Sequence, residues 1–156
     1  MNYVMAKSFL NRAGLGCLLF VFSAAPVLAE GMAGVGEKIA DFSAKVTSVN
    51  YLEDRNILTI ESDGDIGKYG TVGASVTFMA PVDAKGTVGP YSGRGMSFRP
   101  DGTTVGFTSH GVWKSLGGHR WQVNTIGLGA DGARTLAVGV LELKTMSFKG
   151  SIYGLN

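Results

Sequence analysis

Apolar and polar side chains alternate along most of the chain after residue 41. This period of two is typical of β-strands that bury one face. Turn-forming sequences interrupt the alternation at Asp63-Gly64, Pro100-Asp101-Gly102, Gly117-Gly118 and Asp131-Gly132, where glycine accepts the positive φ values that hairpins need. The pattern predicts eight strands, over residues 42–51, 56–62, 69–79, 89–99, 103–115, 119–129, 134–145 and 147–154.

Eight short strands joined by hairpins predict an all-β fold, an antiparallel meander that closes into a small barrel, with a sandwich as the alternative. Closure is favoured because it leaves no strand edge exposed. Glycine makes up 22 of the 127 residues after position 29, which suits tightly coiled barrel strands. Only residues 34–45 offer a short helix.

Alternation also predicts which side chains face the interior. The seventh strand is ambiguous because both of its faces are apolar. For the fifth, sixth and eighth strands, the predicted inward residues are Val105, Phe107, Ser109, Gly111, Trp113, Trp121, Val123, Thr125, Phe148, Gly150 and Ile152.

The fourth predicted strand carries a charge among apolar residues. If Met96 and Phe98 point inward, the period of two places Arg94 inward with them. By the same rule, Glu142 would face inward with the valines of the seventh strand. A buried arginine keeps its charge and needs a partner, so we hypothesise an interior pair between Arg94 and Glu142.

A short motif occurs twice in the chain. Met96-Ser97-Phe98-Arg99 and Met146-Ser147-Phe148-Lys149 share an apolar, serine and cation order, but their flanking residues differ. We interpret them as two half-buried strands with similar burial needs, and not as a duplicated functional element.

The first 29 residues have the features of an export signal. Lys7 and Arg12 precede an apolar run over residues 13–25, and small residues lead to a predicted cleavage after Ala29. The run is shorter than the roughly 20 residues of a membrane span, although an uncleaved anchor and a lipidated Cys17 are alternatives. We therefore expect a periplasmic or secreted protein with a signal peptide (1–29), an N-terminal extension (30–41) and one barrel domain (42–156).

Cleavage would change the charge of the chain. It removes two of 14 cations and none of 12 anions, so 12 of each remain and the formal net charge becomes zero. A neutral chain without a basic cluster does not suit nucleic-acid binding. The single cysteine also leaves, which excludes disulfides and thiolate chemistry. No stable membrane span is expected after cleavage.

The sequence predicts neither a metal site nor a cofactor. His110 and His119 are the only histidines, and we expect both at the surface. Asp63-Gly64-Asp65 lacks the later acidic ligands of a calcium loop, so a solvated hairpin is the better interpretation. No nucleophile elbow is present, and the glycine-rich residues 86–95 lack the following helix of a phosphate loop.

The predicted barrel interior is therefore the candidate site. A barrel of about eight strands can hold one small ligand or be filled by its own side chains. Aromatic walls with a few polar groups are typical of small-molecule pockets, but the same aromatic residues could form only a core. The candidate ligand-binding residues are Arg94, Met96, Phe98, Phe107, Ser109, Trp113, Trp121, Thr125 and Glu142.

Two stretches carry a family resemblance. YSGRGMSFRPDGTTVGFTSHGVW, from Tyr91, and RTLAVGVLELKTMSFKGSIYG, to Gly154, resemble small secreted barrels of the allene oxide cyclase-like type in strand rhythm and glycine positions. The resemblance implies a barrel fold. It also implies a family that includes cyclases and isomerases acting on apolar substrates in the lumen, and proteins without known activity. None of the family's functional residues can be placed on this sequence.

Three functions follow from these observations. The first is an exported barrel that binds a small apolar molecule or a partner protein. The second is a cofactor-free cyclase or isomerase in which Arg94 and Glu142 are the catalytic candidates. The third is a structural protein of the cell envelope. Homo-oligomerisation is compatible with each.

Overall fold

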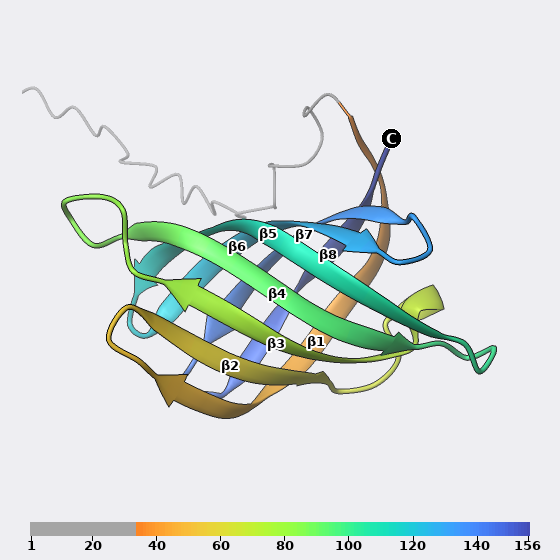
Figure 1. The fold of residues 1–156 in the computed structure, drawn as a ribbon, viewed down its shortest axis with the longest axis horizontal. Coiled ribbons are helices and arrows are strands. Elements are labelled where there is room, and N and C mark those ends of the chain that lie inside the picture. The colour runs from red at the N-terminus through yellow and green to blue at the C-terminus, as the bar shows by residue number, and fades with distance from the viewer. Residues whose placement is uncertain (1–33) are drawn as a thin grey trace, which may run out of the picture.

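The computed structural model describes residues 34–156 as a barrel of β-strands (Figure 1). Within these residues there is one 3-10 turn and no α-helix, and no helix is long and apolar enough to cross a membrane. The predicted signal peptide, its cleavage after Ala29 and Cys17 lie outside the described residues. The elements are β1 (Val35–Tyr51), β2 (Arg55–Ser62), η1 (Gly67–Tyr69), β3 (Thr71–Met79), β4 (Val88–Phe98), β5 (Thr104–Gly117), β6 (Arg120–Gly129), β7 (Arg134–Glu142) and β8 (Ser147–Leu155).

The strands form a closed antiparallel meander. Each strand pairs with the next, and β8 pairs with β1 to close the barrel. The predicted all-β barrel is therefore confirmed. Closure pairs the backbone N–H and C=O groups that an open sheet would leave without hydrogen bonds at its two edges.

β1 is the element that differs most from the sequence prediction. It begins at Val35 instead of residue 42, and Lys38 and Asp41 pair with Tyr153 and Ser151 of β8. The helix considered for residues 34–45 is wrong, and residues 35–41 belong to the barrel instead of an extension. A short isolated helix is marginal in water, whereas a strand here completes the hydrogen-bond ladder that closes the barrel.

The connections between strands gather at two ends of the barrel. We call one the η1 end; it carries residues 63–70, 99–103 and 130–133. The opposite end carries residues 52–54, 80–87, 118–119 and 143–146. In Figure 1, η1 and the turn after β4 lie together on one side, away from the loop between β3 and β4. The predicted hairpin at Asp63-Gly64 is part of the longer connection that contains η1.

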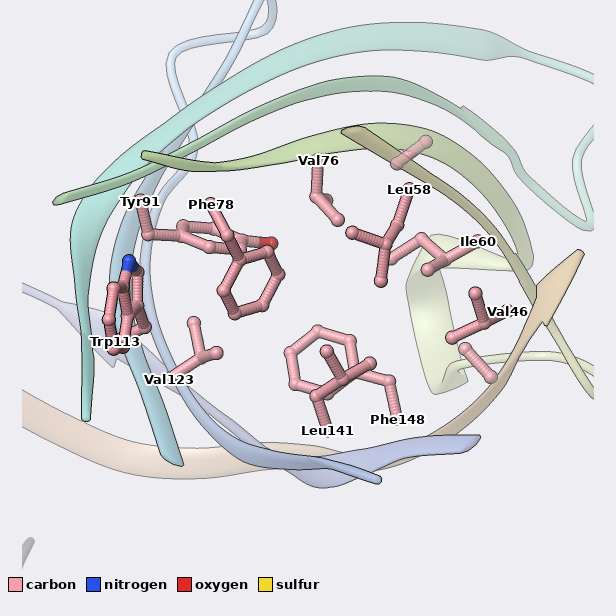
Figure 2. Packing of buried hydrophobic residues seen from close by; sticks show 12 residues of the cluster. Val46, Leu58, Ile60, Val76, Phe78, Tyr91, Trp113, Val123, Leu141 and Phe148 are labelled. Atoms are coloured by element: carbon pink, nitrogen blue, oxygen red, sulfur yellow. The ribbon is translucent and has the colours of Figure 1, made fainter. Parts of the chain in front are cut away.

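The middle of the barrel is filled by apolar side chains (Figure 2). Val123 is fully buried, and the predicted inward faces of β5, β6 and β8 are confirmed by their burial patterns and pocket contacts. On β7, where the sequence was ambiguous, Leu141 is buried and the neighbouring Val140 is exposed. The buried cluster consists of Ala44, Val46, Leu58, Ile60, Ala74, Val76, Phe78, Tyr91, Trp113, Val123, Leu141 and Phe148.

The prediction for β4 is wrong. Met96 and Phe98 are 44% and 53% exposed, and Arg94 is exposed with them, whereas Tyr91 and Ser97 are buried. The inward face of β4 is thus the one rich in glycine.

Large side chains of β5 explain this choice of face. A Cβ at Gly89 would lie 2.5 Å from the indole of Trp113. A Cβ at Gly95 would lie 2.8 Å from Phe107 Cζ and also 2.4 Å from the Gly73 carbonyl oxygen of β3. Because β5 already fills the space in front of β4, β4 can present only residues that leave room for these rings.

The repeated Met-Ser-Phe motif has opposite orientations in its two copies. In β4 the serine, Ser97, is buried and Phe98 is exposed, whereas in β8 Phe148 is only 6% exposed. The two copies are therefore not structurally equivalent, which agrees with the interpretation that they are not a duplicated functional element. The expectation that both strands bury the motif in the same way is wrong.

Candidate functional site

A hollow lies at each end of the barrel that the described residues form. A cavity of about 160 Å³ lies at the η1 end, and a hollow of about 230 Å³ lies at the opposite end. Side chains such as Phe78, Trp113 and Leu141 belong to the buried core and point into the barrel, as Figure 2 shows. The two hollows have no lining residue in common.

The cavity at the η1 end has mainly apolar walls. All eight strands contribute, because the inward positions of every strand near this end face a common space. Small residues on β6 and β7, such as Gly127 and Ala137, leave that space open. Its apolar walls include Phe42, Ala44, Ile60, Val76, Val105, Phe107, Phe148 and Ile152.

A few hydroxyl groups interrupt this apolar wall. Tyr91, Ser109 and Thr125 line the cavity from β4, β5 and β6. Burial raises the pKa of the Tyr91 phenol, so this group stays protonated and can donate a hydrogen bond. Ser97 is already engaged, because its hydroxyl donates to the backbone carbonyl of Tyr69 and so connects β4 to η1.

An ion pair stands at the mouth of the cavity. The Arg99 guanidinium donates to the carboxylate of Asp131, which also accepts the Ala133 backbone N–H at 3.1 Å. The Arg99 hydrogen bond, followed by the Ala133 N–H, holds the pKa of Asp131 below its usual value. The turn after β6 thus fixes the carboxylate, and the carboxylate in turn fixes the guanidinium.

Tyr69 completes the mouth from η1. Burial raises the pKa of its phenol, and the nearby negative charge of Asp131 adds to that effect while Arg99 opposes it. The phenol therefore remains protonated and available as a donor at neutral pH.

Three buried polar atoms at this cavity have no hydrogen-bond partner within the described residues. They are the Tyr69 hydroxyl, Arg99 Nε and the Thr125 hydroxyl, and all three residues line the cavity. Buried polar atoms are nearly always hydrogen-bonded, and leaving one without a partner costs about 1–3 kcal/mol. Their concentration in one cavity distinguishes it from an ordinary core.

The hollow at the opposite end has a different character. It is lined by Trp113 and Trp121, and also by Tyr51 at the end of β1 and Leu52 in the turn that follows. The rim is open to solvent, since Tyr51 is 67% exposed, and the Trp113 indole N–H is already paired with the Met79 carbonyl at 3.0 Å. None of the described residues that line this hollow has a buried polar side-chain atom without a hydrogen-bond partner.

The structure divides the predicted site residues into three groups. Phe107, Ser109 and Thr125 line the cavity at the η1 end. Trp113 and Trp121 line the opposite hollow. The remaining four, which point away from the interior, are Arg94, Met96, Phe98 and Glu142.

The hypothesised interior pair between Arg94 and Glu142 does not form. Arg94 is exposed on β4, where its register partners are Ser75 and Thr108. Glu142 alternates with buried Leu141 on β7 and accepts a hydrogen bond of 3.0 Å from the Thr145 hydroxyl. The two residues lie on strands that are not neighbours, and both belong to the outer surface.

Sequence reasoning missed the polar residues that do define the cavity. Arg99 directly follows β4 and ends the strand predicted over residues 89–99, in alternation with Tyr91 and Ser97, so the correct choice of face would have identified it. Tyr69 and Asp131 lie in connections, where alternation carries no information about facing. Only the closed barrel brings these three residues to one mouth.

The described residues contain no group of three His, Cys, Asp or Glu side chains placed to hold a metal ion. His110 and His119 are both exposed. His119 adopts a positive φ of 60° in the turn between β5 and β6.

The chain matches no protein-family model, no curated protein and no solved structure.

Proposed function

We propose that this protein binds a small, mainly apolar molecule in the cavity at the η1 end. The observation that carries the proposal is the combination of an apolar cavity of about 160 Å³ with three buried polar atoms that have no hydrogen-bond partner among the described residues. Ligand pockets typically pair apolar walls with a few placed polar groups. The resemblance to allene oxide cyclase-like barrels agrees with such a use of the lumen.

The volume of the cavity limits the ligand. An apolar protein cavity of about 150 Å³ is large enough to take up benzene. The enclosed part here should therefore hold a single ring or a short branched chain, with any larger portion of the ligand emerging past Arg99 and Tyr69. Transfer of about 100 Å² of apolar ligand surface from water would contribute about 2.5 kcal/mol.

Binding is preferred to catalysis because of where the charged residues lie. The isomerase hypothesis relied on Arg94 and Glu142 in the lumen, and both face outward. In the cavity itself, the charges of Arg99 and Asp131 are engaged with one another. A binding function needs only the walls and hydroxyls that the cavity provides.

Titration with toluene tests the proposal. We expect toluene to shift the amide NMR signals of residues around the cavity, such as Thr125 and Ala137. Ala137→Leu should weaken binding because it fills the cavity. Val138→Leu is the matched control, since the neighbouring side chain points outward from β7.

The outcome separates binding from a structural role. No shift with toluene up to its solubility, in wild-type protein of unchanged fold, would contradict ligand binding here and favour the structural alternative. Equal weakening by Ala137→Leu and Val138→Leu would place the toluene outside the cavity.

We also propose export to the periplasm or the medium. The support is the order of positive, apolar and small residues before Ala29. Mass spectrometry of the protein from its own host should give an intact mass beginning at Glu30. A mature pool that begins at Met1 would contradict cleavage.

A further inference from the structure

The mouth of the cavity at the η1 end carries hydrogen-bond donors, from Tyr69 and Arg99. Tyr69 and Arg99 are neighbours there: Gly70, which follows Tyr69, lies against the backbone of Phe98 and Arg99, and Arg99 influences the Tyr69 phenol electrostatically. Each contributes one buried polar atom without a protein partner. The two atoms thus belong to residues of two different connections that line the same cavity.

Both of these atoms are hydrogen-bond donors. An arginine Nε can only donate, and a protonated phenol donates through its O–H. The carbonyl of Tyr69 is occupied by Ser97, and the carboxylate of Asp131 is occupied by Arg99 and Ala133. Among the described residues, these two donors have no acceptor, and a ligand that supplies an oxygen acceptor could satisfy both.

The charge of the cavity decides which acceptor fits. Of the described residues that line the cavity, only Arg99 and Asp131 are charged, and they pair with one another. The cavity is therefore neutral in sum. A carboxylate ligand would be an extra anion beside Asp131 in mainly apolar surroundings, where an unpaired charge is costly. A neutral carbonyl oxygen would accept from both donors without that cost.

We propose that the ligand is a neutral molecule with a carbonyl group, such as a small ketone, aldehyde or ester, whose oxygen accepts hydrogen bonds from Tyr69 and Arg99. This inference rests on the proposed binding function and specifies its ligand class. The apolar part of the ligand lies deeper, against Phe107 and Phe148.

Three probes of similar size test the proposal. Acetophenone carries a neutral carbonyl, benzoate carries a carboxylate, and ethylbenzene carries neither. Their dissociation constants are measured by amide NMR titration at pH 7. We expect acetophenone to bind roughly 2–10-fold more tightly than ethylbenzene, as a hydrogen bond of net strength about 0.5–1.5 kcal/mol implies. Benzoate should bind more weakly than both.

A matched pair of substitutions assigns the effect to the mouth. Tyr69→Phe removes the phenolic donor and should bring the affinity for acetophenone toward that for ethylbenzene. Tyr153→Phe makes the same chemical change on β8 at a residue that does not line the cavity, and it should leave both affinities unchanged. Melting temperatures establish that both variants are folded.

The results distinguish this inference from the proposed function. If none of the probes binds, the proposed binding function and this inference are both wrong. If ethylbenzene binds as tightly as acetophenone, or Tyr69→Phe changes nothing, the cavity binds apolar molecules but the carbonyl assignment is wrong. If benzoate binds most tightly, the mouth is an anion site and the inference is overturned.

Discussion

The indole of Trp113 lies directly over Gly89, its register partner on β4. A Cβ at Gly89 would be 2.5 Å from Trp113 Cε2, well inside van der Waals contact. The indole cannot easily move, because it is buried and its N–H donates to the Met79 carbonyl. This contact explains why β4 carries glycine at a position that faces the core.

Gly89→Ala should therefore destabilise the barrel. Overpacking a core typically costs about 1–3 kcal/mol, and the unfolding midpoint in urea should fall accordingly. Gly73→Ala is the control, since a Cβ there meets nothing within 4 Å; it should be neutral or stabilising by up to about 1 kcal/mol. Equal effects of the two substitutions would mean that the Trp113 contact does not constrain position 89.

The two copies of the Met-Ser-Phe motif should respond differently to the same substitution. Phe148→Ala should lower the free energy of unfolding by about 3–5 kcal/mol, because it removes a buried ring from the core. Phe98→Ala should cost about 1 kcal/mol or less, since this ring is largely solvated. Chemical denaturation of both variants checks the assignment, and a larger effect at Phe98 would contradict the facing of β4.

Two hydroxyl deletions should have opposite effects on the unligated protein. Thr125→Val removes a buried hydroxyl without a protein partner, so stability should be unchanged or increase by about 1 kcal/mol. Ser97→Ala removes the donor to the Tyr69 carbonyl and should destabilise by about 0.5–1.5 kcal/mol. Melting temperatures report both. A marked destabilisation by Thr125→Val would show that its hydroxyl has a stabilising partner.

The ion pair at the cavity mouth predicts a dependence of stability on pH. The pKa of Asp131 is lowered by its hydrogen bonds to Arg99 and Ala133. Its contribution is therefore present above the unfolded pKa of about 3.9 and is lost as the pH falls through the lower folded pKa. Between pH 7 and acidic pH, wild-type protein should lose more stability than Asp131→Asn.

The control for this experiment is Asp65→Asn, which removes an exposed carboxylate from the same end of the barrel. As the pH is lowered, the free energy of unfolding of the Asp65→Asn variant should fall in parallel with that of the wild type. If Asp131→Asn also follows the wild type throughout, the ion pair does not contribute to the acid sensitivity of the fold.

The sequence by itself was sufficient to predict the eight strands, their meander and the closed barrel. These depend on local properties: alternation of side chains, glycine in turns and the need to pair every edge. On β5, β6 and β8 the apolar residues also identified the buried face correctly, because one face of each strand is clearly more apolar or more aromatic than the other.

Only the tertiary structure decided which face of β4 is buried and where the polar site lies. Met96 and Phe98 look like core residues in sequence, yet the space inside is already occupied by Phe107 and Trp113 from the neighbouring strand. Whether a side chain is buried depends on the space that the neighbouring strands leave free. The residue pattern of a single strand does not give that space. In the same way, barrel closure brings Tyr69, Arg99 and Asp131 from three separate segments to one mouth.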